Sequence, residues 1–140
     1  MDTSIPVSEL MTRQVVHIEP DTSIDELHRL FERHHFHHIP VLEHGKLVGI
    51  VSKTDYLKVR HVLAITWEGL TIVQDIYKDM TAADIMTREP LKVESSDSIG
   101  LAADIFRANT LHALPVVDDG ELVGIITPHD LLNYAFQGLL

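Results

Sequence analysis

The stretch Gly45-Lys46-Leu47-Val48-Gly49-Ile50 recurs later in the chain as Gly120-Glu121-Leu122-Val123-Gly124-Ile125. The same shift aligns residues 7–57 with residues 82–132 without a gap. A similarity that holds one register over this length indicates two copies of a single supersecondary unit. The sequence therefore predicts two repeats, residues 7–57 and 82–132, joined by a helical connector at residues 58–81.

Each repeat carries the same order of local signals. A short strand is expected first, at residues 15–18, followed by a helix that opens with the capping box Ser23-x-x-Glu26 and has apolar residues at helical spacing. Residues 38–42 and 47–51 then read as two apolar strands on either side of the turn His44-Gly45. A second helix begins after the hairpin, so the predicted order is β-α-β-β-α, twice.

This order predicts an α/β fold of the α+β type. A single repeat has one apolar sheet face and too few residues to be stable alone. The two repeats are therefore expected to pack sheet to sheet as a pseudo-twofold intramolecular dimer, with clefts where the copies meet. In the connector, Trp67 and Tyr77 are predicted to cover the core, with a dimer interface as the alternative, because both residue types are favoured interface anchors.

Composition restricts the function. The chain has 11 basic and 21 acidic residues, a net charge of −10, and an acidic protein repels nucleic acid and anionic membranes. It has no cysteine, which excludes disulfides, thiolate zinc sites and a cysteine nucleophile. The N-terminus lacks a signal peptide and no apolar run has the length of a membrane span. These features predict a soluble, cytoplasmic protein with no nucleic-acid or membrane partner.

Three short motifs occur in the same order in both repeats. They are Met-Thr before the first strand (Met11-Thr12, Met86-Thr87), an apolar-Pro-Val strand, and Leu-Val-Gly-Ile followed by Ser/Thr-x-x-Asp. The last element is Ser52-Lys53-Thr54-Asp55 in the first repeat and Thr127-Pro128-His129-Asp130 in the second. In this arrangement the chain resembles a tandem cystathionine β-synthase (CBS) domain pair, or Bateman module, over nearly its whole length.

The resemblance implies a stand-alone regulatory module that binds AMP, ADP, ATP or S-adenosylmethionine in two clefts between the repeats. It assigns the ribose hydroxyls to the motif Asp and the adenine to residues of the opposite repeat. The first cleft would combine Ile50, Ser52, Thr54 and Asp55 with Met86, Leu91, Leu111, His112 and Ala113. The second cleft would combine Ile125, Thr127, His129 and Asp130 with Met11, Val16, Phe36, His37 and His38.

The chemistry of these residues agrees with that assignment. A carboxylate accepts hydrogen bonds from two vicinal hydroxyls, and a helix start favours a phosphate. The basic residues near the motifs that could contact phosphate are Arg13, Lys53, Arg88 and Lys92. Ser52-x-x-Asp55 and Thr127-x-x-Asp130 also have the pattern of plain helix caps, so the motifs alone leave both roles open.

Two other classes of function are weighed against this one. A ligand-free scaffold or dimerisation domain would have the same fold with vestigial clefts. The cluster His34, His35, His37 and His38 suggests a second alternative, a metal-binding protein or metal-dependent enzyme. Tetrahedral zinc needs four convergent ligands, and we expect no bound metal. No hydrolase, phosphate-loop or zinc-protease motif occurs, so no catalytic residue is assigned and no cofactor is required. We expect a homodimer that signals to a separate regulated protein.

Overall fold

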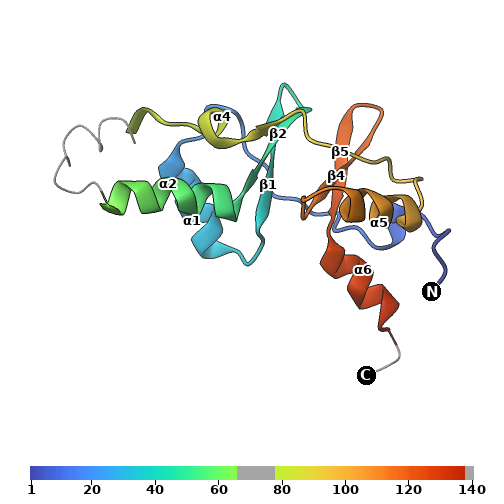
Figure 1. Cartoon of the computed structure of the whole chain (residues 1–140). Coiled ribbons are helices and arrows are strands. Elements are labelled where there is room, and N and C mark those ends of the chain that lie inside the picture. The colour runs from blue at the N-terminus through green and yellow to red at the C-terminus, as the bar shows by residue number, and fades with distance from the viewer. Residues whose placement is uncertain (66–77, 138–140) are drawn as a thin grey trace. The chain divides into compact units, whose positions relative to one another are not determined.

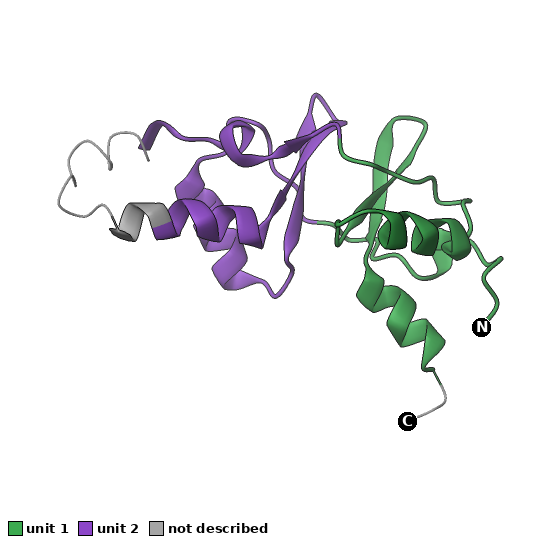
Figure 2. Ribbon diagram, viewed as in Figure 1, with its two compact units in different colours: residues 1–15, 90–140 green, residues 16–89 purple. Residues whose placement is uncertain are grey.

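The computed structural model describes residues 1–65 and 78–137, without the side chains of residues 62–65. The chain divides into two compact units (Figure 2). Unit 1 comprises Met1–Val15 with Pro90–Leu140, and unit 2 comprises Val16–Glu89. Each unit therefore contains the body of one sequence repeat together with the N-terminal segment of the other. The connector residues Trp67 and Tyr77, predicted to cover the core with a dimer interface as the alternative, lie outside the described residues.

Unit 2 contains a helix, a hairpin and a second helix, followed by a short return segment (Figure 1). Strand β1 pairs antiparallel with β2, and β2 pairs antiparallel with β3, in the sheet order β1-β2-β3. The elements are α1 (Ile24–Arg33), β1 (His38–Glu43), β2 (Lys46–Ser52), α2 (Lys53–Ile65), α4 (Ala82–Ile85) and β3 (Thr87–Arg88).

Unit 1 has the same order of elements, but its third strand position is filled by the N-terminal segment of the chain. Strands β4 and β5 form an antiparallel hairpin, and a bridge between Thr12 and Ile125 occupies the place that β3 has in unit 2. The elements are η1 (Val7–Glu9), α5 (Ile99–Ala108), β4 (Leu114–Asp118), β5 (Glu121–Ile126) and α6 (Pro128–Ala135). The predicted α+β class with two repeats is confirmed.

The first strand of each repeat is shorter than expected. Instead of a strand at residues 15–18, Ile18 alone bridges Val41 in parallel, with its N–H donating to the Pro40 carbonyl at 3.0 Å. The next bond of a parallel ladder would need an N–H on Pro40, which proline lacks. In unit 1, Val93 bridges Val116 in the same way, and Pro115 interrupts the ladder.

The hairpin turns follow the prediction. His44 and Gly45 have φ of 51° and 78°, and Asp119 and Gly120 have φ of 49° and 81°. Two consecutive residues with positive φ form the type I′ turn, whose twist matches that of the flanking strands. The turn type and its two-residue length set the register of each hairpin next to the turn.

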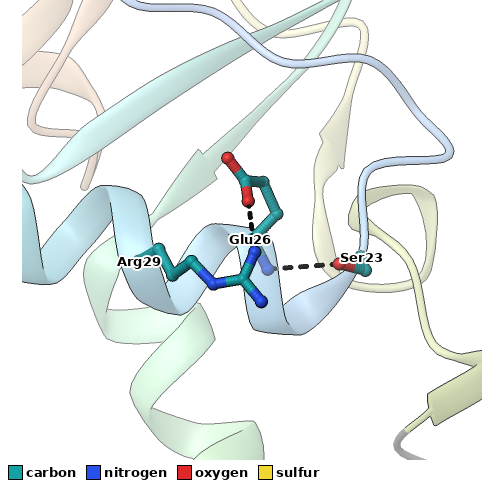
Figure 3. A network of polar contacts seen from close by, with 3 residues as sticks. All are labelled: Ser23, Glu26 and Arg29. Carbon is teal, nitrogen blue, oxygen red and sulfur yellow. Dashed lines mark hydrogen bonds and ion pairs between the residues drawn. The ribbon is translucent and has the colours of Figure 1, made fainter.

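Only half of the expected capping box forms at the start of α1. The Ser23 hydroxyl accepts a hydrogen bond from the Glu26 N–H at 3.1 Å, as a cap requires (Figure 3). The Glu26 carboxylate, however, pairs with Arg29 at 2.9 Å, because residues three apart are neighbours on a helix surface. The expectation of a reciprocal box is corrected accordingly.

Each unit has its own hydrophobic core. In unit 2, Ile24, Leu27 and Phe31 of α1 are buried against the hairpin, as their helical spacing predicts. In unit 1, Ile99 and Ala102 of α5 take the equivalent places. No helix within residues 1–65 and 78–137 has the length and hydropathy that a bilayer span requires.

The segments that contain the Met-Thr motifs are exchanged between the repeats. Thr87, at the start of the second repeat, pairs with Ile50 of the first repeat's hairpin inside unit 2. Thr12, at the start of the first repeat, bridges Ile125 of the second repeat's hairpin inside unit 1. Each unit therefore contains residues of both repeats.

Candidate functional site

The two Ser/Thr-x-x-Asp motifs occupy equivalent places, between the last hairpin strand and the helix that follows. In unit 2, Ser52 ends β2 and Lys53 begins α2. The Ser52 hydroxyl accepts a hydrogen bond from the Asp55 N–H at 3.0 Å, so it caps the helix. Ser52 and Asp55 are both half-buried, which leaves them accessible to a ligand.

The motif in unit 1 forms a complete capping box. The Thr127 hydroxyl caps the Asp130 N–H at 3.4 Å. In return, the Oδ2 atom of Asp130 accepts from the Thr127 N–H at 2.9 Å and from the Thr127 hydroxyl at 3.1 Å. The cap interpretation is therefore confirmed for both motifs, and in unit 1 it also occupies one oxygen of the aspartate.

The hairpins that lead into the two motifs also differ in length. The β1–β2 ladder extends to the pair His38 and Ser52, whereas the β4–β5 ladder stops at Leu114 and Ile126. Thr127 is thus outside the ladder, and its N–H turns to Asp130. In unit 2 the corresponding residue, Ser52, belongs to the ladder. Among the described residues, no hydrogen-bond donor or cation contacts the Asp55 carboxylate.

The exchanged segments bring the predicted methionines to the motifs. Gly49 pairs with Arg88 and Ile50 with Thr87, so Met86 lies beside the strand that leads into Ser52. In unit 1, Met11 lies against Gly124, one residue before Ile125. The structure therefore brings Met86 together with the first predicted set and Met11 together with the second.

The remaining predicted residues are divided between the units. Leu91, Leu111, His112 and Ala113, assigned to the first site, belong to unit 1. Val16, Phe36, His37 and His38, assigned to the second site, belong to unit 2. Their grouping with a motif of the other unit remains a prediction.

Within unit 2, His37 makes a contact that the sequence analysis did not anticipate. The Lys53 N–H donates to the His37 carbonyl at 2.7 Å, which ties the loop after α1 to the start of α2. The repeat alignment places Pro128 at the position of Lys53 and His112 at that of His37. Because proline has no N–H, unit 1 lacks this tie, and the difference was readable from the sequence.

The four basic residues have unequal surroundings. The Arg13 guanidinium donates to the Ser8 carbonyl at 3.0 Å, and Arg88 lies exposed on β3. Lys92 is exposed and Lys53 is half-buried. No carboxylate of the described residues lies within ion-pair distance of any of the four, and Lys53 is the one that lies inside a Ser/Thr-x-x-Asp motif.

The histidines of the first repeat are dispersed. His34 stacks on Phe36 with ring centroids 4.9 Å apart, and His28 is hydrogen-bonded through Nδ1 to the Tyr56 hydroxyl. In the part of the chain that the structure describes, no group of three or more His, Asp or Glu side chains converges as metal ligands. This observation does not favour the metal-binding hypothesis.

A surface hollow of unit 2 lies away from the Ser52–Asp55 motif. It has a volume of about 400 Å³ and lies at the turn end of the β1–β2 hairpin, between Glu19, Asp21 and His44. Ser52 is at the other end of β2. The residues that line the hollow therefore do not include Ser52 or Asp55.

Comparison with known proteins agrees with the motif pattern. The CBS domain family matches residues 7–62 and 82–136, and both segments carry the Gly-Ile-to-Asp element described above. The chain belongs to the CBS domain family. It contains two CBS domains in tandem, and the predicted recognition is confirmed.

Solved CBS pair structures match the whole fold. CBSX2, a CBS-pair protein of Arabidopsis thaliana, has been crystallised in complex with AMP. That structure is 30% identical, covers 95% of this chain and 97% of its own, and gives a TM-score of 0.79. The CBS domain pair of protein MJ0100, in complex with 5′-methylthioadenosine and S-adenosyl-L-methionine, is 26% identical, covers 96% and 98%, and gives 0.75.

One curated relative is longer than this chain. Protein MJ1225 of Methanocaldococcus jannaschii is 30% identical over 138 residues, which cover 96% of this chain and 48% of that protein. The chain thus spans about half the length of this relative. The similarity concerns the CBS pair and not the activity of the longer protein.

Proposed function

We propose that this CBS pair is a regulatory module that binds an adenosine nucleotide or S-adenosylmethionine. The observation that carries the proposal is the aspartate at the third position of α2 and of α6, each preceded by a hydroxyl residue at the end of a hairpin strand. The AMP complex of CBSX2 and the complexes of MJ0100 support an adenosine ligand.

In this proposal Asp55 and Asp130 accept hydrogen bonds from the two ribose hydroxyls, as acidic residues do in dinucleotide-binding folds. Ser52 and Thr127 lie next to the ribose or the phosphate. The N–H groups at the helix start and a nearby cation stabilise a phosphate. Lys53 is the cation we assign to this role in unit 2.

The complete sites combine residues of both CBS domains. Adenine contacts come from the domain opposite the motif: Leu91, Leu111, His112 and Ala113 for the Asp55 site, and Val16, Phe36, His37 and His38 for the Asp130 site. Met86 and Met11 line the two sites from the exchanged segments. A structure with bound ligand would test this grouping.

The module carries out no catalysis of its own in this proposal and acts on a separate regulated protein in the cytoplasm. Ligand binding alters the state of the CBS pair, and the partner responds to that state. The scaffold alternative has the same fold with no ligand. A difference in stability between liganded and ligand-free protein separates the two.

We also propose that the protein is a homodimer. Helix α6 has no buried residue; Leu132 within it and Phe136 at its C-cap are 55% and 54% exposed. Leu57 of α2 occupies the repeat position of Leu132 and is 44% exposed. Large apolar residues exposed at equivalent positions on the second helix of each repeat suit an interface with a second copy.

A thermal unfolding series tests the nucleotide proposal. The wild type is melted in buffer and with AMP, ADP, ATP or S-adenosylmethionine, beside the double variant Asp55→Ala/Asp130→Ala. A ligand at ~100 times its dissociation constant adds about 2.7 kcal/mol, a clear rise in Tm. The proposal predicts a rise for at least one ligand in the wild type and none in the double variant. No rise with any ligand would favour the scaffold.

A further inference from the structure

The two CBS motifs differ in the state of their aspartates. The Oδ2 atom of Asp130 already accepts two hydrogen bonds from Thr127, at 2.9 and 3.1 Å. Asp55 receives no such bond within the described residues, where its own N–H donates to the Ser52 hydroxyl. Both oxygens of Asp55 are therefore available for two vicinal hydroxyls, whereas a ribose at Asp130 has to share or displace the Thr127 donors.

The residue after Ser52 or Thr127 differs as well. Lys53 begins α2 and brings a positive charge two residues before Asp55. Pro128 begins α6 and brings neither a charge nor an N–H donor, and His129 follows it. A hydrogen bond that a lysine ammonium donates to a phosphate is roughly twice as strong as one between neutral groups, and proline offers no such donor.

We infer that the Ser52–Asp55 motif is the tighter of the two adenosine sites and selects ligands that carry a phosphate, with Lys53 as the residue that determines this selectivity. The Thr127–Asp130 motif binds more weakly and discriminates little between adenosine and AMP. This inference rests on the proposed function, since it assigns unequal roles to the two sites of one nucleotide-binding module.

The positions of the motifs make the comparison well controlled. The two motifs share a hairpin turn type and a methionine from an exchanged segment, so Lys53 and Pro128 are compared at equivalent backbone positions. The His37 carbonyl also anchors the Lys53 backbone at 2.7 Å, which fixes the start of α2 before a ligand arrives. Unit 1 lacks the equivalent anchor because of Pro128. Preorganisation of this kind favours binding at the Asp55 motif.

Isothermal titration with AMP and with adenosine tests the inference. The proteins are the wild type, Asp55→Ala, Asp130→Ala, Lys53→Met and the control Lys58→Met, an exposed lysine on the same helix. We expect Asp55→Ala to remove the tighter AMP binding event and Asp130→Ala to retain it. Lys53→Met should weaken AMP binding about tenfold, which corresponds to about 1.4 kcal/mol, and leave adenosine affinity within about twofold. Lys58→Met should behave as the wild type.

The outcomes separate this inference from the proposed function. If neither ligand binds the wild type, the nucleotide function is wrong and the inference falls with it. If AMP binds but Asp130→Ala removes the tighter event, or if Lys53→Met weakens AMP and adenosine equally, only the inference is overturned. The variant Pro128→Lys gives a further check, because it should raise the AMP affinity of the weaker site.

Discussion

The Sδ atom of Met86 lies 2.5 Å from the point that a Cβ atom would occupy on Gly49. The equivalent pair in the other unit is Met11 and Gly124, with 2.6 Å. Glycine is thus required in each Leu-Val-Gly-Ile strand because the Met-Thr segment of the other repeat crosses directly over it. The Met-Thr motif of each repeat therefore packs on the Leu-Val-Gly-Ile motif of the other repeat.

A methyl group at either glycine should destabilise the protein. At Gly124 the added Cβ would also lie 2.9 Å from the Thr12 carbonyl, a backbone atom that cannot move aside as a side chain does. At Gly49 the backbone neighbour, the Thr87 carbonyl, is at 3.0 Å. Overpacking of this kind costs about 1–3 kcal/mol, and we expect Gly124→Ala to exceed Gly49→Ala. Urea unfolding of both variants measures the difference, and wild-type stability in both would contradict the crossing.

The hairpin turn offers a separate test in which an added methyl group meets no other residue and only the local backbone conformation matters. Gly45 has φ of 78° and no atom within 4 Å of an added Cβ, so only backbone strain opposes Gly45→Ala. We expect a loss of about 1 kcal/mol in the free energy of unfolding. His44→Asn should raise stability slightly, because asparagine tolerates positive φ better than most residues. Equal stability of Gly45→Ala and the wild type would argue against the type I′ turn.

Much of this fold was predictable because its signals are local. The capping residue Ser23 and the turn His44-Gly45 specify the start of a helix and a hairpin from their immediate neighbours. The shortening of the first strand was also within reach, since Pro40 and Pro115 each lack the N–H that a longer ladder needs. The buried positions on α1 followed from their spacing alone.

The exchange of segments was not predictable from the repeat itself. Sequence similarity shows that Thr12 and Thr87 are equivalent, but it does not show which copy of the hairpin each one pairs with. The difference between Asp55 and Asp130 was hidden for a related reason. Both belong to the same motif, and the motif alone does not show that the Asp130 carboxylate accepts from Thr127 while the Asp55 carboxylate receives no equivalent bond.

Tyr56 should make the stability of unit 2 sensitive to alkaline pH. Burial raises the pKa of the Tyr56 hydroxyl above its ordinary value of 10.0, and its side chain is only 2% exposed. Because the folded-state pKa is the higher one, the contribution to stability is complete below pH 10 and is lost as pH rises through the folded-state value. Tyr56→Phe should therefore show a shallower loss of unfolding free energy above pH 10.

The same substitution should also lower stability near pH 7 by about 1 kcal/mol, because His28 loses its hydrogen-bond partner. Urea titrations from pH 7 to 11 measure both effects. An identical slope in Tyr56→Phe and the wild type would show that Tyr56 is not the group responsible.

The homodimer proposal makes a prediction about α6. Replacing its exposed apolar residues, Leu132→Glu together with Phe136→Glu, should produce a monomer without unfolding unit 1, because neither residue contributes to the buried core. Sedimentation velocity of the wild type and the variant measures the change. Leu101→Glu on α5, where the leucine is 43% exposed, is the control and should remain dimeric. A monomeric wild type would refute the proposal.

The central claim is that this CBS pair holds an adenosine ligand through its two motif aspartates. Isothermal titration of AMP into the wild type and into Asp55→Asn/Asp130→Asn tests it most directly, because asparagine keeps the size of the side chain and removes its charge. The account predicts saturable binding to the wild type and at least a roughly 100-fold loss in the double variant, from two charge-assisted hydrogen bonds at each site. AMP binding of equal strength to both proteins would contradict it.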